Sequence, residues 1–171
     1  CVCGIVSEKS GVIKFNSVKI HDLIDFQIAK LGIGLVPEGR RIFSNLTVHE
    51  NLLVSAKEGE WDQKKIYDLF PRLLDRKYQL GGSLSGGEQQ MLSIGRALMT
   101  NPKLLILDEA TEGLSPIIQK EIWNVLATLK KSGLSIIIVD KSLEKLSQVA
   151  DYFYFLVKGK VAWKGKYKQL N

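Results

Sequence analysis

Apolar residues recur along this chain at two spacings, one typical of buried strands and the other of helices. Apolar runs within residues 33–36, 104–107 and 135–139 predict strands that lie inside a sheet. Amphipathic helices are expected at residues 116–131 and 143–149, after the second and third of these strands. Because buried strands that alternate with helices pair in parallel, the pattern predicts an α/β fold whose sheet is covered on both faces.

Other elements are predicted from turn and capping residues. Thr47 is followed three residues later by Glu50, which forms a capping box and predicts a helix start. The charged segment 58–79 is helical in pattern, and Pro71 should interrupt it. A short helix is expected over residues 23–30.

Two β-hairpins should flank these elements. Residues 11–20 alternate apolar and polar positions around a turn at 16–17. Residues 152–165 are predicted to form the second hairpin, around a turn at 158–159.

The composition is that of one globular domain with its own core: 171 residues, 45% apolar and 25% charged. The apolar runs are too short to cross a bilayer and no signal segment opens the chain, so we expect a soluble protein. The net charge of +6 is compatible with nucleic acid, but Lys and Arg are spread out and no aromatic-interleaved RNA motif accompanies them. We therefore expect no nucleic-acid partner. Cys1 and Cys3 are interpreted as reduced thiols.

Two acidic residues end the second predicted strand. Asp108 and Glu109 follow four apolar residues, and the carboxyl ends of strands are where open α/β sheets bind ligands. In a nucleotide hydrolase the first acid would hold Mg²⁺ and the second would orient or deprotonate the attacking water. Taken alone, the pair is explained equally well by helix capping at a strand end.

A glycine-rich turn lies shortly before this strand. Ser85 is the expected N-cap of a helix that the Asn-Pro pair at 101–102 ends, and Gly86 and Gly87 let backbone N–H groups approach a phosphate. An ordinary glycine turn before a helix is equally common. The acidic strand a short distance downstream favours the phosphate-binding interpretation.

These motifs together resemble a known family. The run "LSGGEQQMLSIGRALMTNPKLLILDEATEGLSP" resembles the signature motif, linking helix, Walker B strand and D-loop of ATP-binding cassette (ABC) ATPases. "GIGLVPEGRRIFSNLTVHENL" is similar to the ATP-binding subunits of branched-chain amino acid importers. The resemblance implies a P-loop NTPase-like (RecA-like) core at about 1–38 and 99–171, an inserted helical subdomain at about 39–98, and truncation at the N-terminus.

The resemblance also implies a function. Such a subunit dimerises head to tail with a second ATP-binding subunit, identical or not, and sandwiches two ATP molecules. It drives transmembrane permease subunits from the cytoplasmic face of the membrane. The signature residues that would contact the ATP of the opposite subunit are Ser85, Gly86, Gly87 and Gln89.

Further roles follow from the same resemblance. Asp108 would be the Mg²⁺-associated acid and Glu109 the catalytic base. Glu38 stands at the Q-loop position near the metal, and Ser115 stands at the D-loop position usually held by Asp. Ser115 is also the expected N-cap of the helix at 116–131.

Two departures from the family pattern affect these roles. Lys141 occupies the switch position that is usually His. It can donate to a γ-phosphate, but it cannot share a neutral proton relay with Glu109. The sequence also contains no GxxxxGK followed by Ser or Thr. We therefore expect that this chain, read as a piece of a longer protein, is inactive by itself.

Two alternatives to an importer ATPase stay open. One is a non-transport member of the same superfamily that acts on nucleic acid or ribosomes, which the positive charge favours. The other is a non-catalytic fragment that completes the ATP site of a partner. The transported solute is not encoded here, because selectivity would reside in other subunits.

Overall fold

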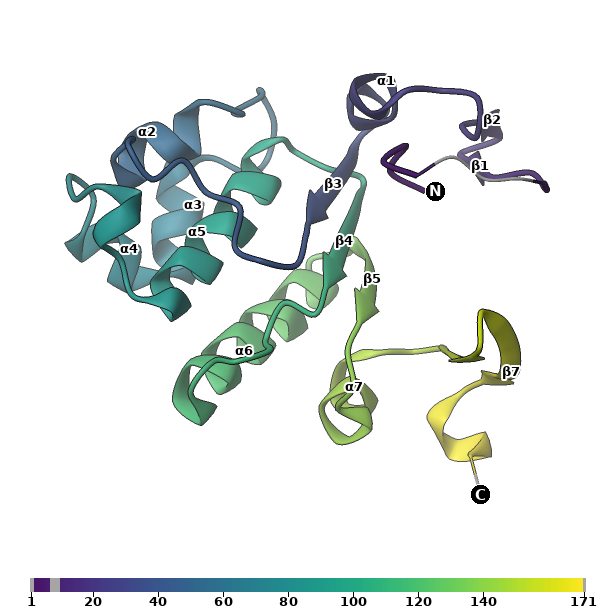
Figure 1. Cartoon of the computed structure of the whole chain (residues 1–171). Coiled ribbons are helices and arrows are strands. Elements are labelled where there is room, and N and C mark those ends of the chain that lie inside the picture. Colours follow the sequence, from purple (N-terminus) through teal and green to yellow (C-terminus); the bar gives the residue numbers. More distant parts are fainter. Residues whose placement is uncertain (1, 7–9, 171) are drawn as a thin grey trace.

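A three-stranded parallel sheet forms the middle of the molecule, whose computed structural model describes residues 2–6 and 10–170 (Figure 1). The strands, in order across the sheet, are β3 (Ile33–Val36), β4 (Leu104–Asp108) and β5 (Ser135–Val139). All three run in the same direction, so their carboxyl ends meet at one edge. The predicted α/β fold with a parallel sheet is confirmed. Cys1 lies outside the described residues.

Residues on the two faces of the sheet pack into two different apolar clusters. Leu105 and Leu107 of β4 are fully buried in the larger cluster, together with the apolar face of α6 (Pro116–Lys131). Leu104 and Ile106 join the smaller cluster, which includes Ile28 of α1 (Asp25–Lys30). Alternate residues of one strand therefore serve different layers, as the two-residue period of a strand requires.

Strand β5 differs from the prediction of a sheet covered on both faces. Ile136 and Ile138 pack against the larger cluster, but Ile137 is 47% exposed and Val139 is 51% exposed. The expectation is wrong here, because among the described residues α1 and its neighbours cover this face only at β3 and β4. An apolar run predicts a strand, but it does not show which faces have a covering partner.

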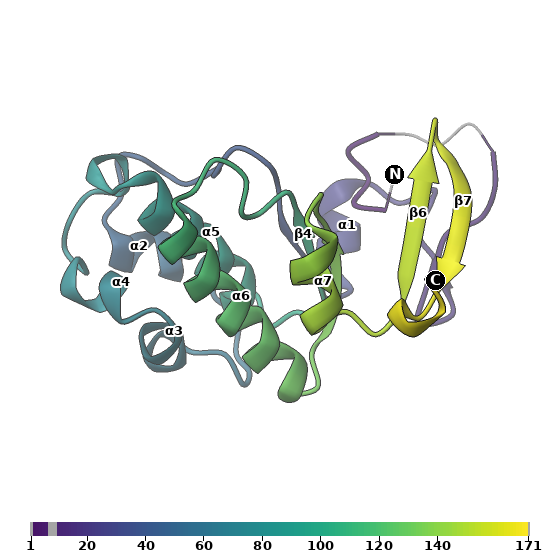
Figure 2. The ribbon, with the colours of Figure 1, turned by 90° about the horizontal axis from the view of Figure 1, so that it is seen from below.

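A group of helices packs beside the sheet around α5 (Gly86–Met99), as Figure 2 shows. Its other members are α2 (Val48–Leu53), α3 (Gln63–Leu69) and α4 (Pro71–Asp75). Pro71 ends the preceding helix and occupies the first turn of the next, where its missing N–H leaves no partner unsatisfied. Apolar residues of all four helices join the larger cluster, so this group and one face of the sheet share a core.

Local capping fixes most helix ends where the sequence predicts them. The capping box of Thr47 and Glu50 forms at the start of α2. Helix α6 and α7 (Leu143–Val149) have the predicted bounds. Helix α1 begins two residues later than expected, because Ile24 is extended (φ −79°, ψ 161°) and forms the N-cap.

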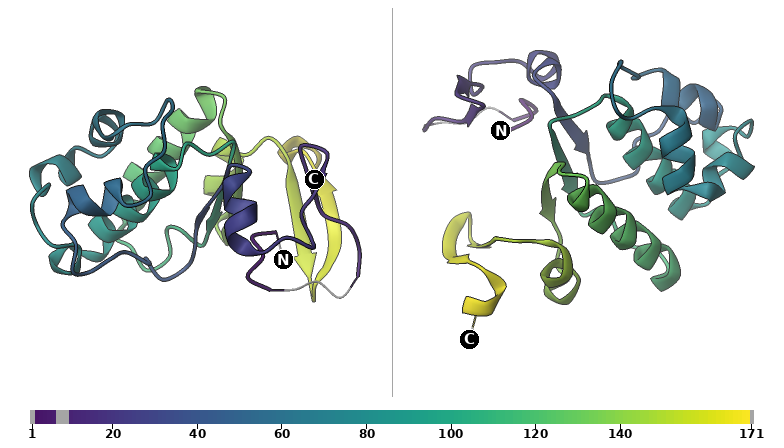
Figure 3. Two further views of the ribbon diagram at one scale, coloured as in Figure 1. Left: turned by 90° about the horizontal axis from the view of Figure 1, so that it is seen from above. Right: turned by 180° about the vertical axis from the view of Figure 1, so that it is seen from behind.

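Both predicted hairpins form, and each is a separate two-stranded sheet (Figure 3). The first joins β1 (Lys14–Phe15) and β2 (Val18–Lys19) and the second joins β6 (Phe153–Val157) and β7 (Lys160–Gly165). The turn residues of both have positive φ, as tight hairpins of this handedness require. Single 3₁₀ turns complete the fold at η1 (Gly81–Ser83) and η2 (Tyr167–Gln169).

Candidate functional site

The carboxyl edge of the sheet holds the two predicted acids. Asp108 is exposed at the end of β4, and its register partner is Val139, the last residue of β5. Glu109 follows with φ 47°, in the left-handed region that residues with a side chain rarely adopt. Its N–H donates to the carbonyl of Val139 at 2.9 Å, which holds the backbone in this conformation. Strain of this kind concentrates at functional sites.

Lys141, just after β5, joins the acids at this edge. Its Nζ lies 2.8 Å from Oε1 of Glu112 and 3.6 Å from Oε1 of Glu109. Glu112 comes from the loop that follows Glu109, so residues from two adjacent strands form one cluster of charges. We call Glu109, Glu112 and Lys141 the charge triad.

The triad shifts the proton affinity of its members. A hydrogen bond with Glu112 raises the pKa of Glu109, helped by partial desolvation and by the charges of Glu112 and Glu38, and opposed by Lys141. The same hydrogen bond and a second one to Lys141 lower the pKa of Glu112. A hydrogen bond to Glu112 raises the pKa of Lys141. Glu109 therefore takes up a proton more readily than an ordinary glutamate, as a general base should.

A cavity of about 340 Å³ opens beside the triad. Its walls are polar: Thr111 donates to Oδ2 of Asp140 at 3.0 Å, and Oδ1 of Asp140 accepts from the N–H of Ser142 at 2.8 Å. The ammonium of Lys145 is held by Gln119. These bonds fix the walls of the cavity, which is therefore polar and lies directly against the triad.

The start of α5 is the second predicted site region. Ser85 is the N-cap: its Oγ accepts from the N–H of Glu88 at 3.3 Å, and Glu88 Oε2 accepts from the N–H of Ser85 at 2.8 Å. Glu88 is 7% exposed and also pairs with Arg76. Burial raises the pKa of Glu88, but the bonds from Ser85 and Arg76 outweigh it, so the net shift is downward. Gly86 and Gly87 form the first turn, where backbone N–H groups have no partner within the helix.

Gln89 and Ser115 are less directly placed to contact a ligand. The Gln89 side chain turns back and donates to the carbonyl of Gly81 at 3.3 Å. Ser115 is exposed at the N-cap position of α6, as predicted, but its hydroxyl makes no capping hydrogen bond. Pro116 follows it at the first helical position and has no N–H to cap.

Arg40 lies between the two site regions. A methyl group added to Gly86 would overlap its guanidinium, and one added to Gly113, the residue after Glu112, would lie 3.7 Å from it. Arg40 itself has φ 52° and follows Gly39 at φ 87°, so the chain turns sharply after Glu38. The exposed Glu38 acts electrostatically on Glu109 and thus faces the same edge.

The carboxylates of this edge suit a magnesium ion that phosphates also hold. No group of three or more His, Cys, Asp or Glu side chains able to hold a metal ion occurs in the described residues. Mg²⁺ usually takes only one or two carboxylates and completes its shell with phosphate and water. Asp108 and Glu38, both exposed, are of the type and number that such an ion requires.

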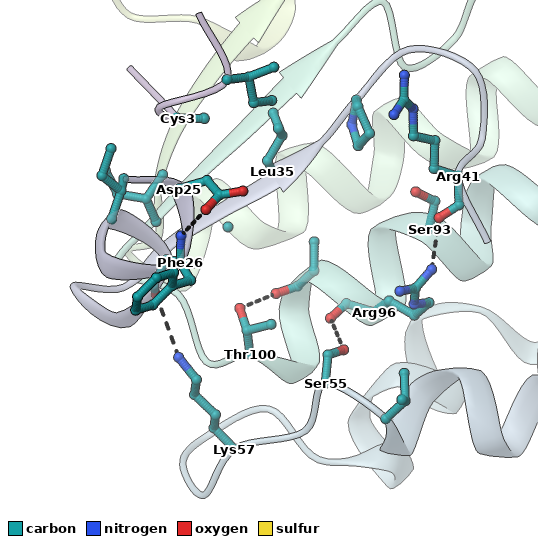
Figure 4. Close-up of a pocket in the computed structure, with 18 of the residues that line it drawn as sticks. Cys3, Asp25, Phe26, Leu35, Arg41, Ser55, Lys57, Ser93, Arg96 and Thr100 are labelled. Atoms are coloured by element: carbon teal, nitrogen blue, oxygen red, sulfur yellow. Dashed lines mark hydrogen bonds between the residues drawn. The ribbon is translucent and has the colours of Figure 1, made fainter. Parts of the chain in front are cut away.

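A second cavity, of about 740 Å³, contains none of the predicted site residues. It lies between α1, β3 and the second half of α5 (Figure 4). Arg96 donates to the carbonyl of Arg41 at 2.7 Å, and Ser55 donates to the carbonyl of Arg96 at 3.2 Å. The Nε of Arg96 is buried without a hydrogen-bond partner in the part of the chain that the structure describes, but the size of the cavity alone does not make it the site.

Three contributors were not identified from the sequence. Glu112 and Arg40 gave no local signal, because their importance depends on which residues the fold brings beside them. Glu88 could have been found, since Ser85 and Glu88 have the spacing of a capping box. Its partner Arg76 lies 12 residues upstream and required the structure.

No helix in the described part of the chain has the length and apolar character needed to span a bilayer.

Comparison with known proteins gives a consistent result. A family described as ABC transporter matches residues 1–112. The chain is 41% identical over 165 residues to the high-affinity branched-chain amino acid transport ATP-binding protein BraG of Pseudomonas aeruginosa, covering 94% of this chain and 71% of that protein. It is 33% identical to the probable branched-chain amino acid transport ATP-binding protein LivF of Archaeoglobus fulgidus, covering 99% and 74%.

A relative with another role is also similar. The lipopolysaccharide export system ATP-binding protein LptB of Haemophilus influenzae is 31% identical, covering 99% of this chain and 73% of that protein. Among solved structures, the ADP conformation of MJ1267, an ATP-binding cassette of an ABC transporter, superposes with a TM-score of 0.83 at 26% identity. That match covers 98% of this chain and 74% of the other. The fold is therefore that of P-loop NTPase cassettes.

Proposed function

Because this chain belongs to the ABC transporter family, as an ATP-binding subunit with ATPase relatives, we propose that it powers the import of branched-chain amino acids. The observation that carries the proposal is the 41% identity to BraG, compared with 31% to LptB. LivF, named for the same class of solute, supports it. Lipopolysaccharide export is the second candidate, and the LptB similarity favours it.

The geometry supports a division of roles at the carboxyl edge. Glu109 would take the proton of the water that attacks the γ-phosphate, since its raised pKa and its place beside the cavity suit a base. Lys141 would bind the phosphate as a point charge. Asp108 and Glu38 would hold Mg²⁺, which when bound would neutralise charge on the phosphates.

The start of α5 would bind a phosphate that a second subunit presents. Ser85 is exposed and Gly86 is partly exposed at the positive end of the helix, where the first N–H groups have no partner within the helix, while Gly87 is buried beside them. Gln89 and Ser115 would lie at the margin of this contact. In this proposal two ATP-binding subunits assemble face to face, and each completes the ATP site of the other.

The remaining assignments complete the proposal. The helical part at about 39–98 would be the subdomain nearest the permease, and the rest would be the nucleotide-binding core. The protein would work at the cytoplasmic face of the membrane through transmembrane permease subunits. Nucleic acid is not expected among its partners.

A transport assay tests the proposal. The complete protein, expressed from its whole reading frame and purified with its membrane partners, would be reconstituted in liposomes with ATP. We expect ATP-dependent movement of labelled leucine, isoleucine or valine, and none with Glu109→Gln. Movement of lipopolysaccharide instead would favour the second candidate, and an absence of ATP hydrolysis by the complete protein would refute both.

A further inference from the structure

The position of Lys141 is set by charges and not by packing. Its side chain is 73% exposed, and its ammonium contacts two carboxylates that differ in distance: 2.8 Å to Glu112 and 3.6 Å to Glu109. Glu112 is therefore the closer partner. A lysine stem has four rotatable bonds, so the ammonium can move from one carboxylate to the other at little cost.

Neighbouring groups leave Lys141 only these two partners among the described residues. Asp140 is already bonded to Thr111 and Ser142. The second cation of the cavity, Lys145, is held by Gln119 and makes no ion pair with the triad. A loss of Glu112 would therefore leave Glu109 as the nearest anion for Lys141.

We propose that Glu112 is a positioning residue: it takes the shorter contact with Lys141 and so holds the ammonium farther from Glu109, which leaves Glu109 able to accept a proton from water. The inference rests on the proposed function for its consequence, but the contact itself is independent of it. An ammonium bonded directly to a base would occupy the lone pairs that must accept the proton of water. Glu112, the closer carboxylate, keeps the ammonium 3.6 Å from Glu109, and an exposed ion pair is weak enough for a triphosphate to draw Lys141 away.

Zero-length cross-linking tests the contact without relying on hydrolysis. A carbodiimide joins an amine only to a carboxylate that it touches, and fragment spectra distinguish Glu109 from Glu112. In the complete protein we expect Lys141 to be joined mainly to Glu112. In Glu112→Gln the cross-link should move to Glu109 and increase several-fold there. Equal joining to both in the unaltered protein, or no gain at Glu109 in the variant, would overturn the proposal.

Kinetics test the consequence. Glu112→Gln should lower kcat for ATP hydrolysis about fivefold, with KM little changed, which is the size of effect that an exposed ion pair supplies. In a Lys141→Gln background the same change should have a clearly smaller effect, because the cation that Glu112 restrains is gone and only its direct contact with Glu109 remains. Glu112→Asp should retain most of the activity. An equal loss in both backgrounds would show that Glu112 does not act through Lys141 and would overturn the proposal.

Glu144 provides the matched control. It is an exposed acid in the first turn of α7, so Glu144→Gln changes the net charge by the same amount near Lys141. Neither the cross-link nor kcat should change. If the unaltered complete protein does not hydrolyse ATP, the proposed function fails, while the cross-link still decides whether Glu112 holds Lys141.

Discussion

The two halves of the candidate site are held in different ways. At the start of α5, Glu88 is buried and bonded to both Ser85 and Arg76, and Gly87 is buried against Ile118. In the charge triad, Lys141 and Glu112 are exposed and are joined by a hydrogen-bonded ion pair. The first region is fixed by packing and capping, and the second is fixed by charge.

This difference determines what a substitution reports. A substitution at the start of α5 should mainly lower the free energy of unfolding, because buried groups lose their hydrogen bonds. A change in the triad leaves the core intact, since exposed ion pairs contribute little to stability. Measurements of activity and of unfolding should therefore distinguish substitutions in one region from those in the other.

The largest expected effect is a loss of hydrolysis without a loss of stability. Glu109→Gln keeps the shape and one hydrogen bond of the side chain but cannot accept a proton, so the hydrolysis rate of the complete protein should fall at least about a hundredfold. ATP binding and the unfolding midpoint should stay close to their normal values. Measurement of all three on one preparation tests this, and near-normal turnover would place the base elsewhere.

The second prediction is a loss of stability at the start of α5. Glu88→Ala removes the capping box and leaves Arg76 without its carboxylate, so the free energy of unfolding should fall by about 2 kcal/mol. Glu50 is the matched control, because it closes the same kind of box with Thr47 at an exposed site. Glu50→Ala should cost less than half as much in denaturant unfolding. Equal losses would show that burial of Glu88 adds nothing.

Much of both regions could be predicted from the sequence, because their signals are local. Strand bounds, the acids Asp108 and Glu109 and the N-cap Ser85 depend on residues only a few positions apart. The role of Gly87 could be predicted only in part. The sequence supports either a phosphate contact or an ordinary glycine turn there, and it does not reveal that an added Cβ would lie 2.8 Å from Ile118 of α6. A substitution there therefore tests packing and ligand binding together.

Other features could not be predicted, because they depend on which distant residues the fold places side by side. Glu112 and Lys141 are separated by 29 positions and meet only because β4 and β5 are neighbours. Arg40 lies over Gly86 for a similar reason. The exposed face of β5 could not be predicted either, since an apolar sequence does not indicate which element will cover a strand.

The third prediction is an acid-dependent loss of stability at the start of α5. The folded-state pKa of Glu88 is lowered, so its contribution is complete above the unfolded value near 4.5 and is lost as pH falls through the lower folded value. The free energy of unfolding should therefore decline below about pH 4.5. Glu88→Gln should flatten this decline in denaturant titrations from pH 6 to pH 3. An unchanged slope in the variant would contradict the assignment, as Glu50, also lowered, would then account for it.

The smallest expected effect compares two serines with nearly the same backbone. Ser85 and Ser115 are both N-caps, with φ −61° and ψ 157° and 151°. Only the Ser85 hydroxyl caps its helix, while Ser115 precedes Pro116, which already presets the first turn. Ser85→Ala should lower the free energy of unfolding by about 1 kcal/mol, and Ser115→Ala should stay within about 0.5 kcal/mol of the parent. Parallel denaturant unfolding of the two variants measures the difference. If both lose the same amount, the bond between Ser85 and Glu88 does not stabilise α5, and the start of this helix is held by packing alone.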